Sequence, residues 1–188
     1  HNLITRGETE RLIARVRESQ ASLVDDLIPK VLALGDVQRV MQNLVKERVS
    51  IRNMDGILEV LSDCGAKSRD PDYLTEQVRE RLAPTICQQL ADPKGEIHVL
   101  TFDPTVEQSL NSAVRSVEEK TALVLEPRFA EQVLKRLSEE VERMSKNNMR
   151  PVLLCAPNLR RHVRRFTERL VPQLSVLSLN EISGHISL

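Results

Sequence analysis

The spacing of apolar residues changes at Asp92-Pro-Lys-Gly95, and this change constrains the fold more than any other feature of the chain. Before it, apolar residues recur every three or four positions, as in amphipathic helices. After it, short apolar runs alternate with helical stretches, which is typical of a mostly parallel sheet with right-handed crossovers. The sequence therefore predicts an α+β or α/β chain, with an all-helical subdomain over 1–92 and a small α/β subdomain over 93–188.

The first half contains clear helix start signals. Thr5-Arg-Gly-Glu8 has the spacing of a capping box. Gly35 and Asp36 should stop one element and cap the next. Asp70 followed by Pro71 suits an N-cap and a first helical turn. Further helices are predicted at 36–47 and 53–64, a pair joined by a short turn.

Two prolines interrupt helical patterns in this half. Pro29 should bend a helical stretch over 22–34 or start a new turn there. Pro84 should kink the helix that runs from Pro71 to Leu90.

The second half alternates between strand and helix patterns. Apolar runs predict strands at Ile97–Phe102, Ala122–Leu125, Val152–Cys155 and Val176–Leu179, with a further candidate at His185–Leu188. Helical patterns follow Asp103-Pro104 as far as Val114, follow Pro127 as far as Met144, and cover 158–171.

The last of these helices contains the densest positive patch of the chain. Asn158 should cap it. Its predicted buried stripe consists of Leu159, Val163, Phe166 and Leu170. Its candidate partner-binding residues are Arg160, Arg161, Arg164 and Arg165.

Two interpretations of these arginines are open. They can form a partner-binding surface, because arginine is enriched at interfaces and binds carboxylates through two bonds. Alternatively, they form a solvated face that pairs with acidic neighbours such as Glu139, Glu140 and Glu142. Single-stranded RNA would need interleaved aromatic residues, and only Phe166 is present.

Composition argues against several classes of protein. Lys and Arg number 27, as do Asp and Glu, so no broad nucleic-acid or anionic-membrane surface is expected. The three cysteines are widely spaced, which is typical of reduced thiols in a cytosolic protein. The four histidines lack ligand spacing, so no metal site is predicted.

No constellation of catalytic residues is present, and we expect no enzyme activity and no cofactor. The alternative function is a helix-turn-helix regulator that binds nucleic acid through the helices at 36–47 and 53–64. Against it, the outward residues of the second helix include Asp55, Glu59 and Asp63, which phosphate would repel.

No run of about 20 apolar residues, the length of a membrane helix, occurs in the sequence. The chain begins at His1 within a helical pattern, so we expect it to be a fragment of a longer protein.

Several long segments, in order, resemble the cytoplasmic region of the type III secretion export-gate proteins, the FHIPEP family. They are Leu27–Leu44, Val49–Glu59, Leu74–Arg79, Arg150–Leu170 and Pro172–Ile182. The arginine-rich string at 160–165 favours the injectisome branch of the family over the flagellar branch.

The resemblance implies a non-enzymatic scaffold. Family members have a membrane half in the bacterial inner membrane and a cytoplasmic half that forms a nonameric ring. That ring receives export substrates and chaperones, and it meets the stalk protein of the associated ATPase. By resemblance, the helical half would pack against neighbouring copies and the α/β half would dock partners.

Overall fold

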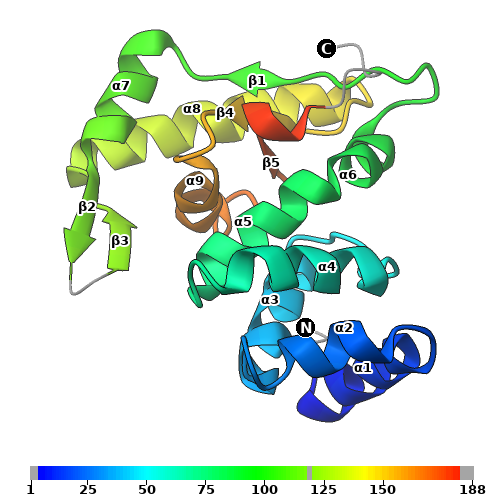
Figure 1. Ribbon diagram of the computed structural model, residues 1–188. Coiled ribbons are helices and arrows are strands. Elements are labelled where there is room, and N and C mark those ends of the chain that lie inside the picture. Colours follow the sequence, from blue (N-terminus) through cyan, green and yellow to red (C-terminus); the bar gives the residue numbers. More distant parts are fainter. Residues whose placement is uncertain (1–3, 118–119, 183–188) are drawn as a thin grey trace. The chain divides into compact units, whose positions relative to one another are not determined.

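The computed structural model describes residues 4–117 and 120–182, with the side chains of 116–121 left aside. These residues form two compact units, His1–Ile86 and Cys87–Leu188. The division falls within helix α6 (Ala83–Leu90). Figure 1 shows the elements of each unit.

The first unit is helical, as predicted. Its helices are α1 (Arg6–Ser19), α2 (Ala21–Leu27), α3 (Leu34–Lys46), α4 (Met54–Gly65) and α5 (Pro71–Arg81). Helices α3 and α4 both pack against α5, and α1 packs against α2 and α3. Because α5 lies between them, α3 and α4 make their main contacts with α5 rather than forming a helix-turn-helix pair.

The predicted start signals of two helices are confirmed. The Thr5 hydroxyl accepts from the backbone N–H of Glu8, and the Glu8 carboxylate accepts from the backbone N–H of Thr5, each at 3.1 Å. The Asp70 carboxylate caps α5 by accepting from the N–H of Asp72 at 3.2 Å, with Pro71 as the first helical residue. The pattern over 71–90 forms two helices rather than one helix kinked at Pro84: α5 ends at Arg81 and α6 begins at Ala83.

The stretch over 22–34 is not one continuous helix: a turn at 28–31 interrupts it, in agreement with the predicted new turn at Pro29. Helix α2 ends at Leu27, and Ile28 is extended, with φ −117° and ψ 120°. A residue before proline is pushed into this region by contact with the proline ring. The next helix begins at Leu34, with Asp36 in its first turn, where its carboxylate accepts from the N–H of Ala33 at 3.0 Å.

The second unit has the predicted mostly parallel sheet. Strands β1 (Leu100–Thr101), β4 (Val152–Cys155) and β5 (Ser175–Ser178) are parallel, in the order β1-β4-β5. Helices α7 (Pro104–Ser112), α8 (Pro127–Lys146) and α9 (Arg160–Thr167) connect or flank them, and the 3-10 turn η1 (Leu179–Glu181) follows β5.

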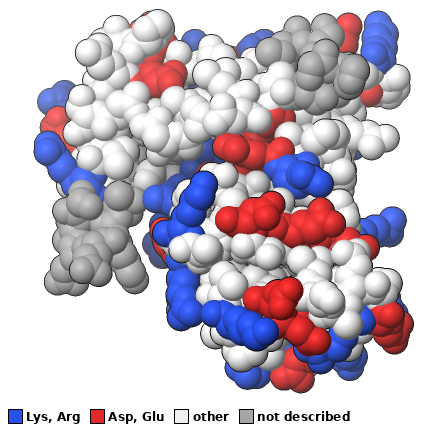
Figure 2. Space-filling view, in the orientation of Figure 1, with Lys and Arg blue, Asp and Glu red and all other residues white. Residues whose placement is uncertain are grey.

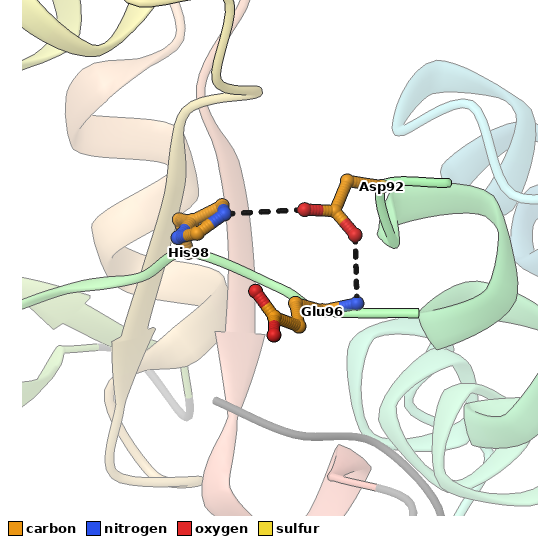
Figure 3. A group of neighbouring side chains, drawn as sticks. All are labelled: Asp92, Glu96 and His98. Atoms are coloured by element: carbon orange, nitrogen blue, oxygen red, sulfur yellow. Dashed lines mark hydrogen bonds and ion pairs between the residues drawn. The ribbon is translucent and has the colours of Figure 1, made fainter. Parts of the chain in front are cut away.

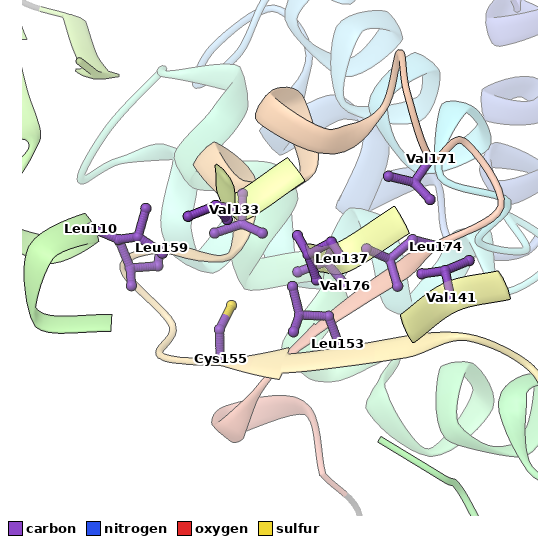
Figure 4. Packing of buried hydrophobic residues seen from close by; sticks show 11 residues of the cluster. Leu110, Val133, Leu137, Val141, Leu153, Cys155, Leu159, Val171, Leu174 and Val176 are labelled. Atoms are coloured by element: carbon purple, nitrogen blue, oxygen red, sulfur yellow. The ribbon is translucent and has the colours of Figure 1, made fainter. Parts of the chain in front are cut away.

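The core of this unit lies between the sheet and α8 and α9 (Figure 4). Leu153 and Val176 point inward from neighbouring strands, and Val141 of α8 and Val163 of α9 are fully buried. Aliphatic residues dominate this core, as the low aromatic content requires. Burying such side chains is worth about 1.5–3 kcal/mol each.

The predicted elements of this unit differ from the structure in two places. Strand β1 has two residues instead of the six at 97–102. Extending its register with β4 would set His98 opposite Pro151, which has no N–H to donate. Val114, predicted in a helix, begins β2 (Val114–Val117), which pairs antiparallel with β3 (Lys120–Leu123). The strand candidate at 185–188 lies outside the described residues.

The arginine helix is shorter than the predicted 158–171. It begins at Arg160 with Leu159 at the N-cap, while the Asn158 amide instead donates to the Asn111 side chain at 2.6 Å. Leu170 lies beyond the end of the helix and is 56% exposed, so it does not continue the buried stripe.

Candidate partner-binding site

Helix α9 follows β4 and precedes β5, and it packs against β5. Its apolar side is well formed: Leu159 and Val163 are fully buried, and Phe166 is partly buried against the same core. This packing fixes the direction of each arginine on the helix. The four predicted binding residues therefore have different environments.

Arg160 is buried, with 2% of its surface exposed. Its guanidinium donates to the backbone carbonyl of Val176 in β5 at 3.1 Å. A buried cation needs such acceptors, because desolvation without them is very unfavourable. Arg160 therefore ties the first turn of α9 to the neighbouring strand.

Arg164 is half-buried and also donates to backbone carbonyls of the following segment. Its guanidinium donates to the carbonyl of Leu174 at 2.7 Å and lies 3.5 Å from the carbonyl of Pro172. Both carbonyls belong to the segment that leads into β5. Arg164 therefore holds the return of the chain from the helix to the sheet.

Arg161 and Arg165 are the other two predicted residues. Arg165 is exposed, as is Arg169 beyond the helix end, whereas Arg161 is only partly exposed, in the same range as Arg164. Arg161 and Arg165 are one helical turn apart, so their side chains lie on the same face. The structure thus shows that Arg160 and Arg164 anchor the helix to backbone carbonyls, and that Arg161 and Arg165 share another face of it.

The acidic residues offered as alternative partners are occupied within α8. Glu140 binds Arg136 at 3.1 Å and Arg143 at 2.9 Å, and Glu139 lies 3.5 Å from Arg136. Glu142 binds Lys146 at 3.4 Å. These pairs join residues three or four positions apart on one helix, the usual spacing for such contacts.

A groove of about 550 Å³ lies beside β1 in the same unit. Its apolar lining includes Phe102, Val106 and Phe129, each only partly buried against the core. Asp103, Arg136 and Glu140 add charges of both signs. The sequence pattern placed Phe129 and Val106 inward and gave no sign that a groove would expose them.

Helix α4, which the structure describes throughout, does not present the basic face that the nucleic-acid alternative needs. Asp55, Glu59 and Asp63 are all exposed on α4, as the sequence predicted, and Glu59 lies 3.5 Å from Arg81. Basic and acidic side chains are mixed on the face of this unit that Figure 2 shows. A recognition helix would instead present basic and amide side chains to the phosphates.

Within the described residues, no helix is long and apolar enough to span a membrane. The three cysteines, all within the described residues, form no disulfide; Cys87 and Cys155 are buried, and Cys64 is partly buried.

Comparison with known proteins gives consistent matches along the chain. Residues 1–187 match the FHIPEP family. The chain is 38% identical to the flagellar biosynthesis protein FlhA of Bacillus subtilis and 37% identical to that of Escherichia coli K12, over 99% and 97% of its length. It spans only 28% and 26% of these two proteins, about a quarter of each.

Solved structures share the same fold. The C-terminal domain of InvA has a TM-score of 0.89 at 25% identity, over 98% of this chain and 56% of that one. CdsV of Chlamydia pneumoniae, solved in complex with CdsO, has a TM-score of 0.84 at 28% identity, over 97% and 54%. The nonameric EscV cytosolic domain from the type III secretion system has a TM-score of 0.81 at 27% identity, over 98% and 54%.

Proposed function

The chain belongs to the FHIPEP family, and from this premise we propose that it is part of the cytoplasmic region of a type III protein export gate. In the whole gate, this region lies beneath the bacterial inner membrane and acts as a non-enzymatic scaffold for export substrates and chaperones. The match to FlhA proteins and to the EscV cytosolic domain supports this assignment.

Sequence identity differs between relatives from the two branches of the family. It is 38% and 37% to the two flagellar proteins and 27% to EscV. These values do not test the predicted preference for the injectisome branch, which stays a prediction.

The helical unit is proposed to pack against neighbouring copies in a ring. The nonameric assembly of EscV, which has the same fold, supports a ring for the parent protein. Head-to-tail contacts of one surface with a different surface of the next copy close such rings.

The α/β unit is proposed to dock the stalk protein of the export ATPase through Arg161 and Arg165. The observation that carries this proposal is that two of the four α9 arginines, Arg160 and Arg164, anchor the helix to the following segment. Arg160 and Arg164 fix the helix to carbonyls of the following segment, so the other two arginines are presented on a rigid support. CdsV was solved in complex with CdsO, which supports docking of a second protein on this fold.

Charge reversal in the parent protein tests this function. Arg161→Glu with Arg165→Glu should reduce export while ring assembly persists, because the helix anchors are untouched. Arg128→Glu with Lys135→Glu is the matched control, since it reverses the same charge at two exposed positions of α8. Equal export by both double variants would exclude the α9 surface as a docking site.

A further inference from the structure

The loop between α6 and β1 holds one carboxylate in a fixed position. Asp92 Oδ1 accepts from the backbone N–H groups of Lys94 and Glu96, at 2.9 Å each. The backbone N–H of Asp92 donates to the carbonyl of Glu96 at 2.8 Å. Gly95 closes the turn with φ +80°, a conformation that suits glycine. The loop therefore leaves Asp92 Oδ2 directed toward His98.

Three side chains with metal-binding atoms gather at this point (Figure 3). His98 Nε2 lies 3.2 Å from Asp92 Oδ2. A carboxylate oxygen of Glu96 completes the group, and all three atoms lie within 4.8 Å of one another. Two ligands of a tetrahedral ion with bonds of about 2.0 Å are about 3.3 Å apart, so the Asp92–His98 distance already fits.

We propose that Asp92, Glu96 and His98 bind a divalent first-row transition-metal ion such as Zn²⁺. Imidazole nitrogen and carboxylate oxygen are both ligands of Zn²⁺ in proteins, whereas Ca²⁺ and Mg²⁺ prefer oxygen alone. Glu96 is the adaptable ligand, because no other described residue bonds its carboxylate and a side-chain rotation can bring it closer. Three protein ligands would leave a coordination position for water.

The surroundings admit such an ion. A pocket of about 350 Å³ beside the cluster is lined by the three residues and by Asn147, Asn148 and Arg150, which leaves room for a water ligand. The Arg150 guanidinium donates to the carbonyl of Gln89, which holds this positive charge on a backbone acceptor. The hydrogen bond from the Glu96 N–H holds the pKa of the Asp92 carboxyl below its usual value.

The sequence alone does not reveal this group, because its spacing is not one of the usual metal-ligand patterns. The spacing here is Asp-x₃-Glu-x-His, and only the turn at Gly95 brings the three residues together. This proposal differs from the sequence prediction of no metal site.

Calorimetric titration of the 188-residue chain with Zn²⁺ tests the site, in a Cys64→Ser background that removes the most accessible thiol. We expect one saturable site. Glu96→Gln and His98→Gln should each weaken Zn²⁺ affinity at least about tenfold, because each removes a ligand. Glu131→Gln, the same change at an exposed position of α8, should leave the affinity unchanged.

Cobalt spectroscopy gives the second readout. Co²⁺ should produce a visible absorption band without a thiolate charge-transfer band, and His98→Gln should abolish it. Absence of saturable Zn²⁺ binding, or equal affinity in Glu96→Gln, His98→Gln and the parent chain, would overturn the proposal. Both measurements use the isolated chain, so their outcome is independent of the proposed export function.

Discussion

Helices α8 and α9 are both rich in charge, yet they use it in opposite ways. On α8, arginines and glutamates at i, i+3 and i, i+4 pair with one another along the helix, as Glu140 does with Arg136 and Arg143. On α9, two arginines leave the helix and bind carbonyls of the chain that follows, Arg160 at Val176 and Arg164 at Leu174. A count of charges therefore does not show which of them are available to a partner.

This difference in pairing follows from the positions of the acidic residues in the two helices. Helix α8 alternates basic and acidic residues at helical spacing, so its charges are satisfied locally. Helix α9 contains no acid between Arg160 and Thr167, and backbone carbonyls of the segment that enters β5 lie beside it and accept from two of its arginines. The carbonyls take the place that carboxylates have on α8.

The comparison predicts its largest effect at Arg160. Arg160→Ala should lower the free energy of unfolding by roughly 3 kcal/mol, because it removes buried packing and leaves the Val176 carbonyl without this donor. Chemical denaturation measures the loss. Arg165→Ala on the outer side of the same helix is the control and should change stability by less than about 0.5 kcal/mol. Equal effects of the two variants would show that Arg160 does not anchor the helix.

The apolar side of α9 should give an intermediate effect. Phe166→Ala should destabilise the protein by about 1–2 kcal/mol, below the value for a fully buried phenylalanine, because Phe166 is only partly buried. Leu170→Ala provides the comparison at a residue that is 56% exposed, and its effect should be close to zero. A larger loss for Leu170→Ala would mean that the helix extends as the sequence predicted. The midpoints of thermal unfolding of the two variants measure these effects.

The ion pairs of α8 should give the smallest effect. Glu140→Gln removes the carboxylate shared by Arg136 and Arg143, and should destabilise the protein by about 0.5–1 kcal/mol. High salt should reduce the difference, since it screens exposed pairs. Glu131→Gln on the same helix should have no measurable effect. A loss for Glu140→Gln that is unchanged in high salt would contradict local pairing.

Local signals in the sequence predicted much of the fold. The capping box at Thr5 and the buried run Val152–Cys155 depend on neighbouring residues alone, and both are confirmed. Strand β1 is shorter than its apolar run because its extent depends on Pro151, which precedes β4. The hairpin that begins at Val114 was read as helix because Val106, Leu110 and Val114 share helical spacing.

The candidate site was also predicted only in part, because some of its contacts involve residues that are distant in the sequence. Helical periodicity identified α9 and the side of it that is buried. It could not show that Arg160 would find an acceptor on β5, because that carbonyl is sixteen positions away in sequence. Nor could it bring Asp92, Glu96 and His98 together without the turn at Gly95.

The central claim is that Arg161 and Arg165 form a docking surface that Arg160 and Arg164 support. Titration of the chain with a purified export-ATPase stalk protein, at low and high salt, tests it most directly. We predict that Arg161→Glu with Arg165→Glu abolishes most of the low-salt affinity, with folding retained, and that Arg128→Glu with Lys135→Glu leaves it near the parent value. Parent-like affinity of the α9 double variant at low salt would contradict the claim.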